Sequence, residues 1–410
     1  MKMPAGCGWT AALISSTLLF ASVPAAEPET PLGLYVRDGV LLQDGAPYRA
    51  IGANYFSLFS RRLQDPDDLS YREGLEQLSA AGIPFVRFMA CGFWPVDWDL
   101  YRRDPETYFA LLDEVVAAAE ATGMGLIPSL FWYYPAVPDL VGESMDQLGN
   151  PRSASCAWIR RYTEEVVTRY RHSPAVWGWE MGNEYNLAVD LPNAASHRPP
   201  VWPRLGTAPQ RTERDELTSE QMLVAFGEFA RTVRRHDPHR ILVTGNSIPR
   251  PSAYHNTAHR TWQRDTLEQF TQVLRRDNPD PFDTLSVHIY PEDDGQYPAR
   301  AESVQELVAI VQDLAVEAGK PLLIGEFGPG RSGDPARDRT EFEAMVQAVE
   351  ESGAALAAFW VFDLPAQEAT WNVTFENDRA FMIEVAAQAN ARLRRARRDG
   401  ASAAERGGVE

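Results

Sequence analysis

The sequence predicts a single (β/α)₈ barrel, because eight short apolar runs alternate with amphipathic stretches of helical periodicity. Each apolar run opens into a polar or glycine-rich loop, and no glycine-rich phosphate-binding loop follows any of them. Apolar strands that alternate with helices are typical of a parallel sheet covered by helices. Eight such units favour a closed barrel over an open sheet. The missing phosphate loop disfavours the doubly wound nucleotide-binding folds.

The expected strands are near-continuous apolar runs, and the expected helices carry an apolar stripe at spacings of three and four residues. The strands are Tyr48–Asn54, Phe85–Met89, Leu126–Phe131, Val176–Met181, Ile241–Thr244, Leu285–Tyr290, Leu322–Phe327 and Ala355–Phe362. The helices are Tyr71–Ala81, Glu106–Ala121, Ala157–Tyr170, Ser219–Arg235, Trp262–Arg275, Ser303–Ala318 and Arg339–Glu351. Upstream, Asp38-Gly39 and Asp44-Gly45 predict tight turns. We therefore expect an N-terminal β-hairpin that closes the bottom of the barrel.

The two ends of the chain are expected to lie outside the barrel. Residues 1–26 read as a signal peptide, with Lys2 before the apolar run Trp9–Val23 and small residues before a cleavage point. This predicts a secreted or periplasmic protein with no membrane association after cleavage. Residues 27–395 are expected to form the barrel domain. Residues 396–410, which follow an arginine cluster with glycine, alanine and serine, are expected to form a disordered tail.

The composition narrows the class of partner. The chain carries 57 acidic and 39 basic residues, for a formal net charge of −18 and a pI near 4.9. Such a charge argues against nucleic acid and against an anionic membrane surface, so we expect a neutral substrate. The protein is also expected to be a monomer. After signal cleavage Cys91 and Cys156 remain, either as one disulfide or as two separate buried thiols. No cysteine or histidine spacing suggests a metal site, and no cofactor is expected.

Polar side chains recur where the expected strands end. They are Arg87, Asn183, Glu184, His288, Tyr290, Glu326, Trp360 and Asp363. Ionisable groups are costly to bury unless they are paired, and their recurrence at one end of the strands is what a barrel active site requires. Glu184 and Glu326 end the fourth and seventh strands, so they can face each other across the barrel mouth. Glycoside hydrolysis needs two such carboxyl groups, one of them protonated.

Other side chains suit supporting roles around this carboxyl pair. Arg87 and Tyr290 can keep one carboxylate ionised by hydrogen bonding, and His288 can lie near the acid. Glu180, inside the fourth strand, is expected to be a buried structural partner of an arginine. The tryptophans Trp94, Trp98 and Trp132 are open to two interpretations, as ordinary core or as flat surfaces on which sugar rings stack.

Several of these segments resemble the motifs of glycoside hydrolase family 5, in clan A. The matching segments are Gly52-Ala53-Asn54, Val86-Arg87-Phe88, Trp179-Glu180-Met181-Gly182-Asn183-Glu184, His288-Ile289-Tyr290, Ile324-Gly325-Glu326-Phe327-Gly328 and Trp360. They stand in the order of the family, which makes the set far more specific than any one motif.

The resemblance implies a (β/α)₈ barrel that hydrolyses β-glycosidic bonds with retention of configuration. Carried over residue by residue, Glu184 is the general acid/base and Glu326 is the nucleophile. Arg87 and Tyr290 position Glu326, and His288 neighbours Glu184. A retaining mechanism also requires the two carboxyl groups to be about 5–5.5 Å apart.

The resemblance further implies the contacts to the sugar. Asn183 binds the sugar 2-hydroxyl, and Trp360 forms the floor of the site beside the cleaved bond. The sequence departs from the family pattern twice. Many members have a histidine at the end of the third strand, where this sequence has Leu130-Phe131-Trp132-Tyr133, and Tyr185 follows the acid/base where proline is usual. Both departures affect the expected shape of the sugar site, where Trp132 is expected to contact the substrate.

The first strand and the aromatic loops are closer to β-mannanases than to cellulases. We therefore expect an endo-β-1,4-mannanase acting on a plant-type polysaccharide or its oligosaccharides. An endo-β-1,4-glucanase and an exo-β-glycosidase are the alternatives. A catalytically silent carbohydrate-binding barrel is the non-enzymatic alternative, which the presence of both Glu184 and Glu326 disfavours.

Overall fold

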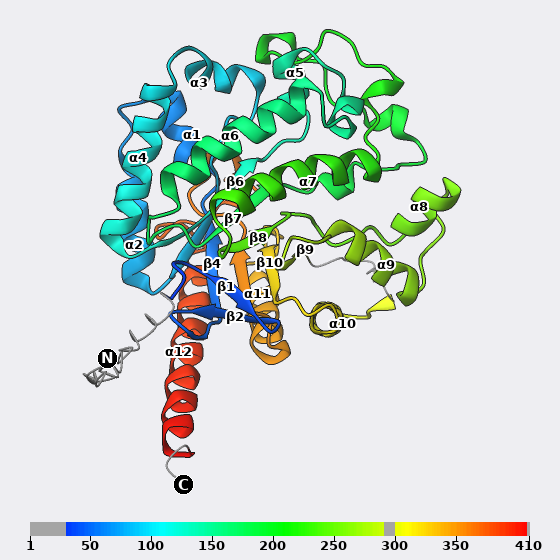
Figure 1. Cartoon of the computed structure of the whole chain (residues 1–410). Coiled ribbons are helices and arrows are strands. Elements are labelled where there is room, and N and C mark those ends of the chain that lie inside the picture. The colour runs from blue at the N-terminus through cyan, green and yellow to red at the C-terminus, as the bar shows by residue number, and fades with distance from the viewer. Residues whose placement is uncertain (1–29, 291–299, 408–410) are drawn as a thin grey trace, which may run out of the picture. The chain divides into compact units, whose positions relative to one another are not determined.

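The computed structural model describes residues 30–290 and 300–407, which form a nearly closed barrel of parallel strands surrounded by helices (Figure 1). The expected signal peptide, residues 1–26, lies outside the described residues. Within the described part of the chain, no helix has both the length and the apolar character that crossing a bilayer requires.

Eight strands form the barrel in the order β8-β7-β6-β5-β4-β11-β10-β9, and each adjacent pair is parallel. They are β4 (Ala50–Asn54), β5 (Phe85–Met89), β6 (Gly125–Phe131), β7 (Gly178–Gly182), β8 (Ile241–Val243), β9 (Leu285–Ile289), β10 (Leu322–Phe327) and β11 (Leu356–Phe359). Almost all of their residues are buried, because helices cover the outside and side chains fill the inside. The predicted fold class is confirmed.

Side chains bridge the remaining gap between β8 and β9. Asn278 Oδ1 accepts hydrogen bonds from the Thr244 hydroxyl at 3.1 Å and from Ser286 N at 2.8 Å. Asp283 Oδ1 accepts one from Leu242 N at 2.8 Å. These bonds satisfy the backbone N–H groups of Leu242 and Ser286, which a regular ladder between the two strands would otherwise pair.

The helices that follow the strands pack around the barrel (Figure 1). They are α1 (Ser57–Gln64), α2 (Ser70–Ala81), α3 (Asp99–Arg103), α4 (Pro105–Thr122), α5 (Ala136–Val141), α6 (Ala154–Tyr170), α7 (Ser219–His236), α8 (Ala253–His259), α9 (Leu267–Asp277), α10 (Val304–Glu317), α11 (Pro335–Ser352) and α12 (Phe381–Gly407). One expected helix, Trp262–Arg275, is wrong at its start. Thr266 caps α9 by accepting a hydrogen bond from Gln269 N, and the Gln269 side chain bonds back to Thr266 N. This capping box begins the helix at Leu267.

The N-terminal hairpin consists of β1 (Tyr35–Arg37) and β2 (Val40–Gln43), followed by the short β3 (Ala46–Pro47). Asp38 and Gly39 have φ angles of 52° and 75°, which is the conformation that a two-residue hairpin turn requires. Just before the hairpin, Leu34 donates to Trp177 O at 2.9 Å and accepts from Ile241 N at 2.8 Å. Because these partners lie at the N-terminal ends of β7 and β8, the hairpin covers the bottom of the barrel, as predicted.

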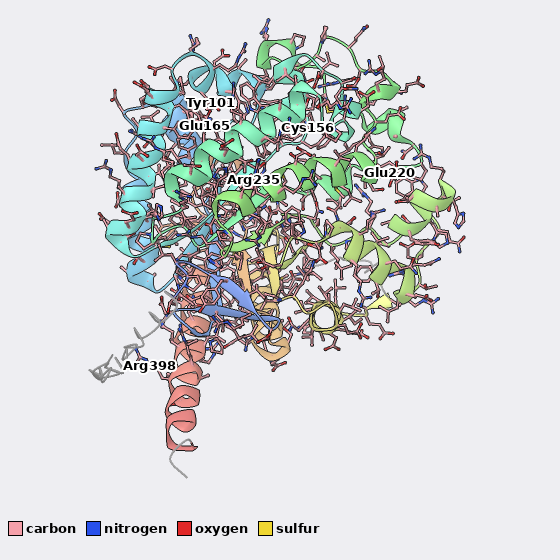
Figure 2. The ribbon with its side chains drawn as sticks, in the orientation of Figure 1. Tyr101, Cys156, Glu165, Glu220, Arg235 and Arg398 are labelled. Carbon is pink, nitrogen blue, oxygen red and sulfur yellow. The ribbon has the colours of Figure 1, made fainter. Side chains whose placement is uncertain are left out.

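The C-terminal helix α12 is anchored to the barrel by Asn390, whose side chain exchanges hydrogen bonds with Ile51 N at 2.8 Å and Ile51 O at 2.7 Å. The helix then continues past the barrel, where Arg398 lies (Figure 2), and ends at Gly407. A disordered tail from residue 396 was expected, so residues 396–407 differ from that prediction. The alanines and arginines of this stretch are good helix formers and extend the preceding turns.

The two cysteines of the barrel are separate buried thiols. Cys91 Sγ accepts a hydrogen bond from Trp132 N at 3.4 Å, and burial raises the pKa of Cys91 to about 12. Cys156 lies at the start of α6 (Figure 2), where its Sγ is 3.5 Å from Leu148 O. Of the two alternatives left open by the sequence, the structure has the free thiols.

Candidate active site

The predicted site residues converge at the C-terminal ends of the barrel strands. They are Arg87 on β5, Trp132 after β6, Asn183 and Glu184 after β7, His288 on β9, Tyr290 after β9, Glu326 on β10 and Trp360 after β11. Their side chains form one connected set of hydrogen bonds and ring contacts, described below. The residues that the sequence placed at the ends of the expected strands therefore lie together in the structure.

Arg87 lies at the centre of this cluster and is fully buried. Its Nε donates to both oxygens of Glu180 at 2.8 and 2.9 Å, and its Nη1 donates to Glu326 Oε1 at 2.8 Å. Its remaining partners are the side-chain oxygens of Asn54 and Asn183, at 2.9 and 2.8 Å. Burial alone would lower the pKa of Arg87, but Glu180 and Glu326 raise it above its ordinary value. Arg87 therefore stays charged, and Glu180 is its structural partner, as predicted.

Glu326 is held at both of its oxygens. Arg87 binds Oε1, and the Tyr290 hydroxyl donates to Oε2 at 2.6 Å. Burial and the charge of Glu326 raise the pKa of Tyr290 far above its ordinary value, so the hydroxyl keeps its proton and acts as a donor. A cation on one oxygen and a hydroxyl on the other stabilise the negative charge of the carboxylate.

Glu184 lies across the site from Glu326, and its surroundings differ from those of Glu326. Its backbone is in the left-handed region, with φ of 53°, and its N donates to Gly245 O at 2.9 Å. A Cβ atom on Gly245 would lie 1.8 Å from Gly182 O, so this close approach of the two loops requires glycine. Burial raises the pKa of Glu184, although Arg87, Ser247 and Arg250 act against the rise. The side chain is still 29% exposed and can be reached by a ligand.

His288 lies between the two carboxyl groups. Its Nδ1 is 3.0 Å from Glu184 Oε1 and 3.6 Å from Glu326 Oε1. Burial lowers the pKa of His288 to about 4, so the ring is neutral at neutral pH. Its Nε2 is buried without a hydrogen-bond partner in the described structure, and a Cβ on Gly325 would lie 2.9 Å from it. Nδ1 is therefore the ring nitrogen that faces the carboxyl oxygens.

The two carboxyl groups are close together. One oxygen of Glu184, one oxygen of Glu326 and a ring nitrogen of His288 all lie within 4.8 Å of one another. Inverting glycosidases need about 6.5–9.5 Å between the carboxyl groups to admit water, whereas retaining ones need about 5–5.5 Å. The short separation fits direct attack. The same three groups could contact a metal ion, but Arg87 already supplies positive charge at Glu326.

Aromatic rings form the wall beside this pair. Trp132 and Trp360 stack with their ring centroids 6.0 Å apart and their planes 28° apart. The Trp360 Nε1 donates to Gln367 Oε1 at 2.9 Å, and the Arg87 guanidinium lies 4.5 Å from the Trp132 ring. Trp98, by contrast, is 1% exposed and belongs to the core.

A cavity of about 310 Å³ opens next to Glu184. The residues around it include Phe93, Tyr133, His197 and Arg250, together with Glu184 and Asn183. The Arg250 Nε and Nη2 both donate to Leu187 O, at 3.1 and 2.8 Å, and within the described residues Arg250 has no carboxylate in an ion pair. The sequence analysis missed Arg250 and His197. The signal for Arg250 was its place six residues after the fifth expected strand, at the mouth of the barrel.

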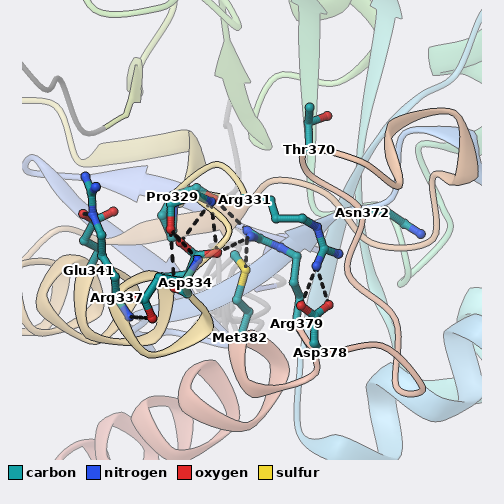
Figure 3. Close-up of polar contacts among 12 residues, drawn as sticks. Pro329, Arg331, Asp334, Arg337, Glu341, Thr370, Asn372, Asp378, Arg379 and Met382 are labelled. Atoms are coloured by element: carbon teal, nitrogen blue, oxygen red, sulfur yellow. Dashed lines mark hydrogen bonds and ion pairs between the residues drawn. The ribbon is translucent and has the colours of Figure 1, made fainter.

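A second layer of polar contacts ties together the loops that follow β10 and β11 (Figure 3). Arg379, which is 1% exposed, donates to Pro329 O at 2.6 Å and lies 3.4 Å from Asp338 Oδ2. Arg331 donates to Asp378 Oδ1 at 2.6 Å. The network fixes the positions of these two loops relative to each other. Because Glu326 and Trp360 directly precede the loops, it also supports the placement of these two residues.

Comparison with known proteins links this site to one family. A model described as Cellulase (glycosyl hydrolase family 5) matches residues 49–363. A curated relative, named probable mannan endo-1,4-β-mannosidase C, from Aspergillus terreus, is 29% identical over 144 residues. That match covers 32% of this chain and 30% of the relative, so the chain matches about a third of the relative's length.

Solved structures share the fold. The endo-1,4-β-mannanase from Rhizomucor miehei superposes with a TM-score of 0.63 at 15% identity, over 88% of this chain and 99% of that one. The exo-β-1,4-mannosidase from Opitutaceae bacterium strain TAV5 gives 0.57 at 18% identity, over 88% and 62%.

Proposed function

The chain belongs to glycosyl hydrolase family 5, and from this premise we propose that it cleaves β-1,4-mannan within the chain, with Glu326 as nucleophile and Glu184 as general acid/base. Membership makes it a glycoside hydrolase with the retaining chemistry of its clan. The assignment of roles is supported by one observation, the contrast between the two carboxyl groups. Glu326 has a cation and a hydroxyl on its two oxygens, whereas Glu184 faces a neutral histidine and has a raised pKa.

In the first step, an oxygen of Glu326 attacks the anomeric carbon while Glu184 donates its proton to the leaving oxygen. The raised pKa of Glu184 favours the protonated carboxyl group that this step requires. Arg87 and Tyr290 each donate a hydrogen bond to one oxygen of Glu326, which fixes the orientation of the nucleophile. The family resemblance assigns the sugar 2-hydroxyl to Asn183, whose side-chain oxygen accepts a hydrogen bond from Arg87 Nη2 at 2.8 Å.

In the second step, water attacks the glycosyl-enzyme, and Glu184 accepts the proton of that water. Esterification removes the negative charge of Glu326, which makes it easier for Glu184 to ionise and act as a base. His288, neutral because of its burial, can donate to either carboxylate without competing for the transferred proton.

Mannan as the substrate is supported by the names of the relatives. The Aspergillus terreus relative and the Rhizomucor miehei structure are both named for cleavage of β-1,4-mannan. The half-buried Trp360 ring, which stacks on the buried Trp132, can offer an apolar face to a sugar, which suits a neutral hexose polymer.

The test is a screen of the purified protein for reducing-sugar release from mannan, glucomannan, cellulose, xylan and mixed-linkage glucan. Mannan and glucomannan should be cleaved fastest, with an early fall in viscosity that marks internal cleavage. The Glu326→Gln variant, which keeps the side-chain shape, is the matched control and should be inactive. Fastest cleavage of cellulose would contradict the choice of sugar, and release of single sugars without loss of viscosity would contradict internal cleavage. Binding of a polysaccharide without its cleavage would indicate a catalytically silent carbohydrate-binding barrel.

A further inference from the structure

A solvent-exposed tryptophan lies outside the pocket already described. Trp202, in the long segment between β7 and α7, is 51% exposed, and its neighbours Val201 and Val96 are 40% and 37% exposed. A Cβ on Gly206 would lie 2.8 Å from Pro95 and 3.4 Å from Val96, which places the two segments in contact. A large aromatic ring exposed to water beside two exposed valines is an apolar surface on which a ligand can pack.

A series of rings connects Trp202 with the catalytic pocket. Trp202 and Trp94 have their ring centroids 5.0 Å apart, and Trp94 and Tyr133 have theirs 5.2 Å apart. Tyr133 in turn lines the cavity that contains Glu184. The rings come from three different loops, after β5, β6 and β7, so their alignment is a product of the fold and not of local sequence.

The segment that carries Trp202 is fixed by polar contacts. Arg211 and Asp139 form a nearly buried ion pair, with side chains 5% and 1% exposed and a separation of 2.6 Å. Trp202 N also donates to the Thr207 hydroxyl at 2.6 Å. Since Asp139 lies on α5, these contacts hold the segment beside that helix (Figure 1). A rigid aromatic surface loses little entropy when it binds a ligand.

We propose that Tyr133, Trp94 and Trp202 form a distal sugar-binding platform, which holds a β-linked polysaccharide chain beyond the sugars at the scissile bond. The proposal rests on the proposed function, because the platform is continuous with the Glu184 cavity. A sugar chain fits this surface because its rings present flat C–H faces to aromatic side chains while their hydroxyl groups stay in water. The absence of charge in mannan also suits a chain with a net charge of −18.

The experiment compares Trp202→Ala with Trp262→Ala. Trp262 is a matched control, because it is 52% exposed and lies in the segment between α8 and α9. Loss of one stacking contact should lower kcat/KM on long mannan by about 3- to 10-fold in Trp202→Ala, and Trp202→Phe should restore most of it. Hydrolysis of the shortest substrate that the wild type accepts should be unchanged. An equal loss on long and short substrates, or an equal loss in Trp262→Ala, would overturn the proposal.

A binding measurement separates this proposal from the proposed function. Both tryptophan substitutions are placed in the Glu326→Gln background, and retardation of each protein is measured by electrophoresis through gels that contain soluble galactomannan or hydroxyethyl cellulose. Weaker retardation of the Trp202 variant alone supports the platform, whichever polymer is bound. Equal retardation of all variants contradicts it, even if the wild type cleaves mannan. If the wild type cleaves no glycan, the proposed function fails. The binding measurement still tests whether Trp202 contributes to polysaccharide binding.

Discussion

The Tyr290 hydroxyl donates a 2.6 Å hydrogen bond to Glu326 Oε2, on the side opposite to the Arg87 contact. We expect Tyr290→Phe to lower kcat by about 10- to 100-fold, because a hydrogen bond to a charged group contributes roughly 1.5–3 kcal/mol. KM should change little, since Tyr290 supports the nucleophile. Steady-state kinetics on soluble mannan or on an aryl glycoside measures both constants.

Tyr101→Phe is the matched control for this substitution. Tyr101 also donates to a carboxylate, Glu165 Oε2, at 2.7 Å, but this pair lies on the outer helices (Figure 2). Its loss should leave kcat unchanged. Equal losses in the two variants would show that a tyrosine–carboxylate bond anywhere in the barrel has this effect, and the role given to Tyr290 would be wrong.

The pH dependence of kcat/KM should respond to the positive charge of Arg250 near Glu184. Glu184 must be protonated for the first step, so kcat/KM falls as pH rises through its pKa. Burial raises that pKa, and Arg250 acts against the rise. We therefore expect Arg250→Gln to move the alkaline limb of kcat/KM to higher pH. Arg231→Gln, on α7 with a side chain that is 63% exposed, should leave the limb in place. A limb that moves to lower pH would contradict the assignment of Glu184 as the acid.

The second-layer network should contribute to stability. Arg379→Met leaves the Asp338 carboxylate buried without its arginine, and breaking a buried pair in this way costs about 3–5 kcal/mol of unfolding free energy. Arg102→Met makes the same change in a pair with Asp99, where both side chains are about half exposed, and should cost less than about 1 kcal/mol. Denaturant unfolding followed by tryptophan fluorescence measures both. Similar midpoints for the two variants would contradict a supporting role for Arg379.

The strands and the central cluster could be predicted because each depends on local pattern. Apolar runs marked all eight barrel strands, with boundaries within a few residues of those observed. Arg87, Glu184 and Glu326 stood out because an ionisable group at the end of an apolar strand needs a specific reason to be there. The barrel then brings such positions together at one end.

Features that depend on contacts between distant loops were not predictable in this way. Arg250 belongs to no recognisable motif, and its place after the fifth strand does not by itself show that it lines the same cavity as Glu184. Trp202 lies in a segment without periodicity, and its ring meets Trp94 only after both loops are placed. The end of α12 was missed for a different reason, because a composition that suits a flexible tail also suits a continuing helix.

The sequence of residues 1–26 predicts that the protein is exported. If they form a signal peptide, the exported protein should begin near Ala26, where the small residues after the apolar run end. Intact-mass measurement of protein recovered outside the cytoplasm, compared with protein made without export, gives the cleavage position. An exported chain that still contains Met1 would contradict cleavage.

The roles of the two carboxyl groups can be separated by replacing each with alanine and adding azide. Glu326→Ala should lose turnover by several orders of magnitude, because no other group can form the glycosyl-enzyme. Azide then fits the space left by the side chain, attacks the anomeric carbon directly and gives a glycosyl azide of inverted configuration. Nuclear magnetic resonance of the product determines this configuration.

Glu184→Ala should behave differently, because Glu326 still forms the glycosyl-enzyme. Aryl glycosides with good leaving groups need no acid in the first step and should be the least affected substrates, whereas poor leaving groups should lose about 10²- to 10⁴-fold. Azide here attacks the glycosyl-enzyme, so the product should keep the configuration of the substrate. The two variants therefore give azides of opposite configuration, and an exchange of these results would reverse the roles of Glu184 and Glu326. In the wild type, the first product seen by proton resonance should be the retained anomer, because one oxygen of Glu184 lies within 4.8 Å of one oxygen of Glu326 and this proximity favours direct attack over attack by an intervening water.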